Sequence, residues 1–368
     1  MPHHIKKFTR FRFTAVGYAF GVLVVAVIFT LSVFMFSPRT ELSIYTWEDY
    51  IAPSVVASFE KKYRVHVTIH EFESVFDLVR AYRENPNLDT YDLIFFSDNV
   101  AEEMRRLDVP TSLERNKIPN IKHITPKLLD TRVNAEGLRV VPYMFGTTGI
   151  VYNKNHINLE TVDWSTLWDE RYINASCLLH DESEVIAAAA FAQEYPAVPE
   201  DDTAMRNTTE MIRAYTARGG AYCSDIALID ELVSERIWIA QDWNGSAIPA
   251  LEENSALAYI IPASGGQFWY DGIAVPRGAH HTQNALRFID FINQPKVAAE
   301  NVEYLQYASV NDSAREYIDP DILANEIIYP SAQTRAKLQS YTDYPYYEAV
   351  ATMRDEIDAI MQTGKLLE

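Results

Sequence analysis

Leu42-Ser-Ile-Tyr-Thr-Trp47 is a short, largely apolar run that opens residues 42–107, the stretch of sequence that decides the fold. The run is typical of a strand, and hydrophobic periods of about 3.6 and of two residues alternate after it. They predict, in order, a helix from Pro53, a strand over residues 64–72, a helix over 76–82, a strand over 91–96 and a helix over 100–107. This βαβαβ order predicts a parallel sheet covered by helices.

A second run of alternating patterns covers residues 177–240. It predicts strands over residues 177–180, 220–223 and 237–240, and helices over residues 184–194 and 229–235. Two open α/β units in one chain predict two lobes with a cleft between them, and ligands of such sheets bind at the carboxyl ends of the strands. Trp164 and Trp168 share a helical stripe with Leu167, so we predict that they are core residues.

The charge of the chain is divided unevenly. Its 368 residues include 32 Lys and Arg against 51 Asp and Glu, and residues 1–40 hold five of the bases and no acid. The net charge is −19, and the remainder carries 27 − 51 = −24. The 48% apolar residues exclude a disordered chain, and the 23% charged residues exclude a polytopic membrane protein. A body this acidic is not expected to bind nucleic acid, and its field attracts cations.

The N-terminal segment, residues 1–40, has the pattern of a membrane signal. Residues 13–36 are 24 consecutive positions without a charge, and four bases stand just before them. That length is sufficient for a helix that crosses a bilayer, with the bases held in the cytoplasm. Bulky residues occupy the exit, where a cleavage site needs small ones. We expect an uncleaved anchor, with a cleaved signal peptide as the alternative, and both place the body outside the cytoplasmic membrane.

Cys177 and Cys223 are the only cysteines in the sequence. An oxidising compartment would permit a disulfide, and two buried thiols acting as small apolar residues explain the sequence equally well. Their spacing matches no zinc, haem or CxxC motif. The sequence leaves both alternatives open.

Aromatic and acidic residues, together with one serine, follow the predicted strand ends, and no Lys or Arg stands among them. The residues are Trp47, Tyr50, Ser97, Asp181, Glu184, Trp243, Trp269 and Asp271. Each alone has another explanation, since a Trp is often core and Asp181 would also cap the helix that follows it. Together they would bring three carboxylates and several aromatic faces to one cleft. Desolvated carboxylates are costly without partners, so the pattern predicts a linear aliphatic polycation as ligand.

Five blocks of this sequence resemble the periplasmic spermidine/putrescine-binding proteins of polyamine ABC importers. The blocks are Tyr45-Thr-Trp-Glu-Asp-Tyr-Ile-Ala-Pro53, Tyr91-Asp-Leu-Ile-Phe-Phe-Ser97, Pro142-Tyr-Met-Phe-Gly-Thr-Thr-Gly-Ile150, Asp242-Trp-Asn-Gly-Ser-Ala247 and Gly265-Gly-Gln-Phe-Trp-Tyr-Asp271. The resemblance implies a bilobed, type II periplasmic-binding-protein fold with a hinge and two crossings between the lobes. Lobe 1 would hold residues 41–147 plus 268–322, and lobe 2 residues 148–267 plus 323–368.

The resemblance also implies a role for each of nine residues. Polar contacts with the ligand amines would come from Ser97, Asp181, Glu184 and Asp271. Aromatic contacts would come from Trp47, Tyr50, Trp243, Trp269 and Tyr307. Two positions depart from the pattern, because Asn99 stands where spermidine binders have an aromatic residue, and Gln339 lies where the match slips. Features of the spermidine and the putrescine type occur together, so the choice of ligand stays open.

The sequence thus predicts a monomeric polyamine-binding protein, without metal or cofactor, that delivers its ligand to an ABC transporter permease in the inner membrane. One alternative is an anchored receptor that reports polyamine to a partner, and another is a binder of a different small organic cation. An enzyme is not expected, because HExxH, GxSxG, P-loop and GxGxxG motifs are missing from the sequence.

Overall fold

The computed structural model describes residues 40–72, 74–85, 88–158, 160–340 and 347–367. The predicted membrane anchor of residues 13–36 lies outside these ranges. Within them, no helix combines the length and the apolar character that crossing a membrane requires.

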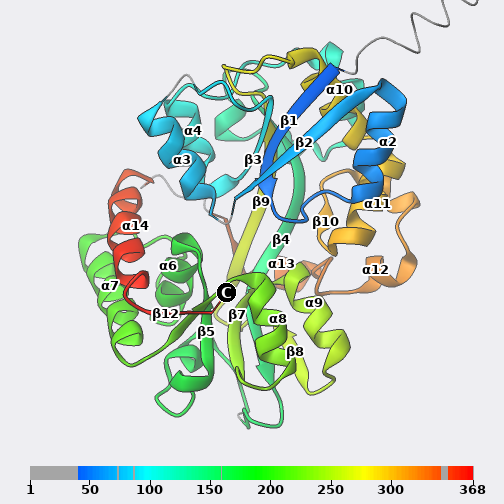
Figure 1. Cartoon of the computed structure of the whole chain (residues 1–368). Coiled ribbons are helices and arrows are strands. Elements are labelled where there is room, and N and C mark those ends of the chain that lie inside the picture. The colour runs from blue at the N-terminus through cyan, green and yellow to red at the C-terminus, as the bar shows by residue number, and fades with distance from the viewer. Residues whose placement is uncertain (1–39, 73, 86–87, 159, 341–346, 368) are drawn as a thin grey trace, which may run out of the picture.

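One sheet runs through the whole molecule in the order β12-β6-β5-β7-β4-β9-β3-β1-β2 (Figure 1). Its strands are β1 Thr40–Trp47, β2 Val65–Phe72, β3 Leu93–Ser97, β4 Val140–Asn153, β5 Ser176–Leu179, β6 Ala221–Cys223, β7 Ile239–Trp243, β8 Leu257–Ile260, β9 Gly266–Ala274, β10 Ala308–Ser309, β11 Leu338–Gln339 and β12 Lys365–Leu367. Strands β8 and β10 pair with β4, and β11 pairs with β9.

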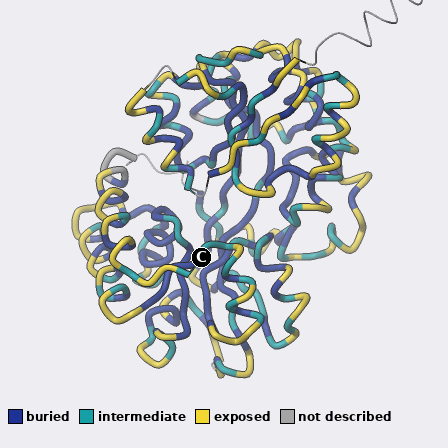
Figure 2. The backbone as a smooth tube through the Cα atoms, in the orientation of Figure 1, coloured by how far each residue is buried: buried dark blue, intermediate teal, exposed yellow. Residues whose placement is uncertain are grey.

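Helices cover both faces of this sheet. They are α2 Pro53–Tyr63, α3 Val75–Glu84, α4 Asp98–Arg106, α5 Pro126–Leu129, α6 Glu182–Phe191, α7 Asp202–Ala217, α8 Asp225–Val233, α9 Asn244–Glu253, α10 Thr282–Ile292, α11 Pro295–Leu305, α12 Pro320–Ala324, α13 Ala332–Arg335 and α14 Tyr347–Met361. Short 3₁₀ helices lie at Arg115–Lys117, Pro119–His123, Arg132–Asn134, Trp164–Trp168, Ile173–Ala175 and Asp312–Glu316. Buried residues follow the strands, whereas exposed ones lie along the outer turns of the helices (Figure 2).

The predicted βαβαβ unit is confirmed. Strand β1 pairs in parallel with both β2 and β3. Helix α2 begins at Pro53, where the missing N–H costs nothing, and buries Val55 and Phe59 against the sheet. Helix α3 begins after Ser74, whose side chain accepts a hydrogen bond from the backbone N–H of Phe76.

The second unit is also parallel, since β5 pairs with both β6 and β7. Its boundaries differ from the prediction because caps decide them. Helix α6 begins at Glu182, after its cap Asp181, and helix α8 begins at Asp225, after its cap Ser224, whose hydroxyl accepts from the N–H of Ala227. Strand β7 extends to Trp243 and includes Gln241 and Asp242. These two polar residues interrupt the apolar run, so the predicted strand ended at residue 240. Trp164 and Trp168 are buried as predicted, on a 3₁₀ turn rather than a longer helix.

Two long strands join the two halves of the molecule. Strand β4 pairs antiparallel with β9 from Val140 to Thr148, and its later residues pair with β7 and β8. One apolar core contains Ile44, Phe95 and Phe288, and a second contains Ile150, Tyr215 and Ile357. Ser97 and Trp243, the last residues of β3 and β7, pair with β9 and β4 in this joining region. Trp269 and Asp271, which were predicted to follow a strand end, lie inside β9 instead.

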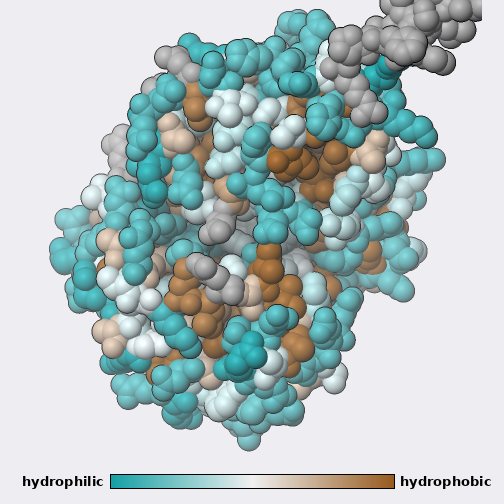
Figure 3. Space-filling view, viewed as in Figure 1, coloured by the Kyte–Doolittle hydropathy of each residue, from teal (hydrophilic) through white to brown (hydrophobic). Residues whose placement is uncertain are grey.

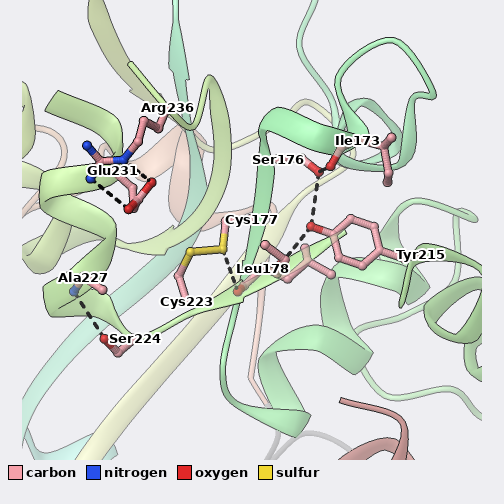
Figure 4. The surroundings of a disulfide bond; sticks show 11 residues. Ile173, Ser176, Cys177, Leu178, Tyr215, Cys223, Ser224, Ala227, Glu231 and Arg236 are labelled. Carbon is pink, nitrogen blue, oxygen red and sulfur yellow. Dashed lines mark hydrogen bonds and ion pairs between the residues drawn. A yellow bond between two sulfur atoms is a disulfide. The ribbon is translucent and has the colours of Figure 1, made fainter. Parts of the chain in front are cut away.

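A disulfide joins Cys177 on β5 to Cys223 on the neighbouring strand β6 (Figure 4). Their Cα atoms are 6.1 Å apart, and both side chains are fully buried. The parallel pairing of Cys177 with Ala221 and of Leu179 with Cys223 brings the two sulfurs together. The alternative that the sequence left open is thus decided in favour of the disulfide.

We predict that reducing this disulfide lowers the free energy of unfolding by about 4 kcal/mol. The two cysteines are 46 positions apart, and without the cross-link the unfolded chain between them gains conformational entropy. Urea unfolding of the body, residues 41–368, with and without dithiothreitol measures the change. Cys177→Ala/Cys223→Ala is the control, since dithiothreitol has no bond to break in it. Equal sensitivity of parent and control to the reductant would contradict the assignment.

Candidate functional site

Asp271 on β9 lies at the centre of the candidate site. It pairs directly across from Ser97, the last residue of β3. The Ser97 hydroxyl donates to Oδ1 of Asp271 and the Tyr50 hydroxyl donates to Oδ2. Burial raises the pKa of Asp271 to about 6, although both hydrogen bonds oppose the rise. This carboxylate is 4% exposed and is held by two neutral donors.

Tyr50 is fixed in place by Tyr143 of β4. The Tyr143 hydroxyl donates to the backbone carbonyl of Tyr50 at 3.1 Å, and the two ring centroids are 5.6 Å apart. Burial raises the pKa of both phenols well above the ordinary value, and the charge of Asp271 adds to the rise. Tyr50 is therefore a neutral donor at any physiological pH.

Aromatic rings continue from Tyr50 in two directions. The ring centroids are 5.1 Å apart for Trp47 and Tyr50, 6.1 Å for Tyr50 and Tyr307, and 5.2 Å for Trp269 and Tyr307. Two glycines make room for this cluster: a Cβ at Gly146 would lie 2.3 Å from the Trp269 ring, and one at Gly245 would lie 2.4 Å from the Tyr307 ring. The four rings form a wall that can cover methylene groups or a cation.

Glu184, in the first turn of α6, is the centre of a second acidic group. The Trp243 indole N–H donates to its Oε1 at 3.1 Å, and its Oε2 makes no hydrogen bond with any described residue. The side chain of Asp181 accepts from the backbone N–H of Glu184 at 3.0 Å. Burial, together with the smaller effect of the neighbouring Asp181 charge, raises the pKa of Glu184 to about 8. Asp181 is thus a helix cap, as one explanation of the sequence held, and also a second carboxylate beside Glu184.

The two weaker candidates have different surroundings. Gln339 uses its side-chain oxygen to accept from the backbone N–H of Ala197 at 2.9 Å, which gives it a structural role on β11. Asn99 lies in the first turn of α4, two residues after Ser97, and its Oδ1 is buried without a hydrogen bond to the described part of the chain.

A hollow adjoins the aromatic wall between β1, β2 and α2. Its volume is about 290 Å³, and its lining includes Trp47 and Tyr50 together with Asp49, Glu60 and Glu71. Carboxylates beside the wall add to the negative field that a cation meets as it approaches.

Three polar residues near the site were not among the sequence candidates. Asp242 is 1% exposed and accepts a hydrogen bond from Ser246 at 2.5 Å, and burial raises its pKa well above the ordinary value. Asp98 is 5% exposed and accepts from Ser340 at 2.8 Å. Asp242 was not a sequence candidate, because only Trp243, the residue after it, was predicted to follow a strand end.

The third is Arg354 on α14, and it corrects an expectation. The strand ends carry no Lys or Arg in the sequence, but the fold brings this guanidinium near the first turn of α6. Its charge lowers the pKa of Asp181 and of Glu182, against the larger effect of burial, which raises both. A residue more than 170 positions from Asp181 could be placed there only by tertiary packing.

The described residues contain no group of three or more His, Cys, Asp or Glu side chains arranged to hold a metal ion. The side chains that the structure gathers at the site are carboxylates and aromatic rings. Desolvated carboxylates with raised pKa values favour a cationic partner.

Comparison with known proteins decides the family. The model of the bacterial extracellular solute-binding protein family matches residues 54–329. The chain belongs to this family. The resemblance seen in the sequence blocks is confirmed, and so is the α/β fold of substrate-binding proteins.

Relatives of this solute-binding protein cover most of its length. The spermidine/putrescine-binding periplasmic protein of Salmonella typhimurium is 28% identical over 305 residues, which cover 82% of this chain and 86% of that protein. The putrescine-binding periplasmic protein PotF of Escherichia coli is 26% identical over 342 residues, covering 88% and 90%. A solved structure from Listeria monocytogenes, assigned to a spermidine/putrescine ABC transporter, superimposes with a TM-score of 0.80 at 26% identity, covering 88% of this chain and 99% of that one.

We predict that Glu184→Gln stabilises the ligand-free solute-binding protein at pH 8 and hardly at all at pH 4. Folding raises the pKa of Glu184 from 4.5 in the unfolded chain to about 8. The contribution of this carboxyl to the stability of the folded protein is therefore fully present below pH 4.5 and is lost as the pH rises through about 8. Glutamine keeps an acceptor for the Trp243 indole and carries no charge. The expected gain at pH 8 is about 1–3 kcal/mol in the free energy of unfolding.

Urea unfolding of both proteins at pH 4, 6 and 8 measures this gain. Glu200→Gln is the matched control, because Glu200 is exposed and the same substitution there removes no buried charge. A gain that is independent of pH, or a loss of stability at pH 8, would contradict the buried-charge interpretation.

Proposed function

We propose that this protein binds a linear polyamine, spermidine or putrescine, outside the cytoplasmic membrane and delivers it to the permease of an ABC transporter. The observation that carries the proposal is the pair of buried carboxyl groups, Asp271 and Glu184, beside aromatic rings. The names of the relatives from Salmonella typhimurium and Escherichia coli support the same ligand class.

The physical argument is one of charge compensation. A buried carboxylate without a cationic partner is unfavourable, and a protonated amine supplies that partner. At an effective dielectric constant near 20, one ammonium about 4 Å from one carboxylate gains roughly 4 kcal/mol before desolvation. Aromatic faces add about 0.5–2 kcal/mol each through cation–π contact. Two such ends exceed the roughly 8 kcal/mol of a micromolar complex, which leaves room for the costs of ordering.

We assign the ligand contacts accordingly. Asp271 and Glu184 would receive the amines, with Asp181 beside Glu184 and Ser97 as a further polar contact. The methylenes would lie against the following aromatic residues: Trp47, Tyr50, Trp243, Trp269 and Tyr307. The lobes proposed from the sequence, residues 41–147 plus 268–322 and residues 148–267 plus 323–368, would close around the ligand by a hinge motion.

The location follows from the same proposal. The named relatives are periplasmic proteins, and residues 13–36 would hold this one at the inner membrane as an uncleaved anchor. Extraction of membranes with alkaline carbonate distinguishes an anchored protein, which stays in the membrane fraction, from a cleaved one, which is released.

We predict that polyamine binding at pH 7 releases about one proton, because Glu184, with a pKa of about 8, ionises when an ammonium binds beside it, whereas Asp271, with a pKa of about 6, is already mostly ionised. Calorimetry of residues 41–368 with putrescine, cadaverine, spermidine and spermine, in buffers of different ionisation enthalpy, measures the number of protons. The release disappears in Glu184→Gln.

1,4-Butanediol has the length of putrescine and no charge, so it is the control ligand and should release no proton. Absence of heat with every polyamine would refute the proposed function.

We further predict that Asp271→Asn weakens polyamine binding by more than tenfold, on the order of 2–5 kcal/mol, because it removes the charge partner of an amine and keeps the shape of the side chain. The dissociation constant from the same calorimetry is the measurement. Asp202→Asn, at an exposed position, is the matched control and should bind as the parent does. Unchanged affinity of Asp271→Asn would remove Asp271 from the site.

Uptake of labelled polyamine by cells that lack the protein tests its role in transport. Lost uptake, restored by the parent and not by Asp271→Asn, is expected of a transport component. Unchanged uptake together with an altered cellular response to polyamine would instead favour a receptor.

A further inference from the structure

Arg354 of α14 is a cation buried at the border between the two halves of the molecule. Its side chain is 6% exposed, and its Nη2 donates to Oε2 of Glu103 on α4 at 3.1 Å. Its guanidinium lies over the ring of Phe76 on α3, 4.6 Å from the ring centroid. Arg83, at the end of α3, contacts the other oxygen of Glu103. One carboxylate thus receives two arginines from two different parts of the chain.

The contact joins the core that contains Ile150 to a third apolar core, which contains Phe96. Helix α14 packs on α6 and α7, and its Met353 and Ile357 belong to the core that contains Trp164. Helices α3 and α4 pack instead on the βαβαβ unit, in the core that contains Phe96. Figure 1 shows α14 below α3 and α4 and beside α6 and α7. The pair of Arg354 and Glu103 therefore ties the two halves together.

This bridge lies at the acidic end of the candidate site. The charge of Arg354 acts on Asp181 and Glu182, the cap and first residue of α6. The side chain that joins the halves is thus close to the end of the cleft where Glu184 would receive an amine.

We propose that Arg354 is a positioning residue of the binding site: its bridge to Glu103 holds α14 against α4 and keeps the cleft closed at the end formed by Asp181 and Glu184 while ligand is bound. The proposal rests on the proposed polyamine-binding function. It assigns no ligand contact to Arg354, which acts through the two helices that it joins.

The chemistry of the bridge suits a contact that forms and breaks. The desolvation of a buried ion pair offsets much of its Coulomb attraction, so the pair adds little net stability. Arg83 also pairs with Glu103, so Glu103 would keep a partner if the halves separated, and Arg354 would then meet water. Opening therefore leaves no buried charge alone, whereas closing restores a planar guanidinium between a carboxylate and an aromatic ring.

The test is the kinetics of polyamine release. We expect Arg354→Met to raise the dissociation rate constant at least fivefold and to change the association rate constant by less than twofold, because an open cleft captures ligand before the bridge forms. Stopped-flow fluorescence of the site tryptophans, with the tightest-binding polyamine found by calorimetry, measures both constants. Arg354→Lys keeps the charge without the planar contact and should restore part of the slow release.

Arg213 of α7 offers a matched control, because its partner Glu356 lies on α14. It pairs with Glu356 at 2.7 Å, but this pair is exposed and joins α7 to α14 within one half. Arg213→Met should leave both rate constants unchanged. Glu103→Gln removes the charge that Arg354 pairs with. In this background, Arg354→Met should therefore raise the dissociation rate constant by less than half as much as it does in the parent protein.

A second measurement needs no ligand. Hydrogen exchange of the α4 amides, residues 98–106, should be faster in Arg354→Met than in the parent and unchanged in Arg213→Met. The proposal is overturned if Arg354→Met lowers the melting temperature without changing the dissociation rate constant, or if it behaves as Arg213→Met does in both measurements. If the parent binds no polyamine, the proposed function fails, and the exchange rates alone decide whether the bridge exists.

Discussion

The burial of carboxyl groups beside aromatic rings is the constraint on which the rest of this structure depends. Asp271 is buried with one hydroxyl on each oxygen, and burial still raises its pKa to about 6. Two neutral hydrogen bonds therefore do not replace the lost hydration of a carboxylate. In the proposed function, a bound cation would compensate this cost.

The fold serves this constraint through the two long strands. Strand β9 carries both Trp269 and Asp271, and β4 beside it carries Gly146, whose lack of a side chain lets the Trp269 ring approach the backbone. Because β3 ends beside Asp271, Ser97 is placed as a donor by register alone. Ser97, Trp269 and Asp271 are thus held on paired strands, which fixes the positions of their polar atoms.

Strand ends were predictable from the sequence because apolar runs mark them, and that is why Trp47, Ser97 and Trp243 could be found as candidates. Trp269 and Asp271 were expected to follow a strand end as well, but both lie inside β9. Residues whose role depends on distant packing could not be found in this way. Arg354 belongs to the C-terminal helix, and no local pattern connects it with Glu103 or with Asp181. The disulfide was equally undetermined, since only the parallel register of β5 and β6 brings its two cysteines together. Helix α7 was not predicted at all, although Asp201 caps it.

The two acidic ends of the site differ in protonation, and this difference bears on what they can recognise. At pH 7 a pKa of about 6 leaves Asp271 mostly ionised, whereas a pKa of about 8 leaves Glu184 mostly protonated. Ionising Glu184 at pH 7 costs about 1.4 kcal/mol, one pKa unit. An ammonium placed beside it gains roughly 4 kcal/mol before desolvation, so it meets that cost. A neutral group gains nothing from the ionised form and leaves the proton in place. In the proposed binding mode, the Glu184 end would therefore favour a ligand that brings a second ammonium over a ligand with a single charge.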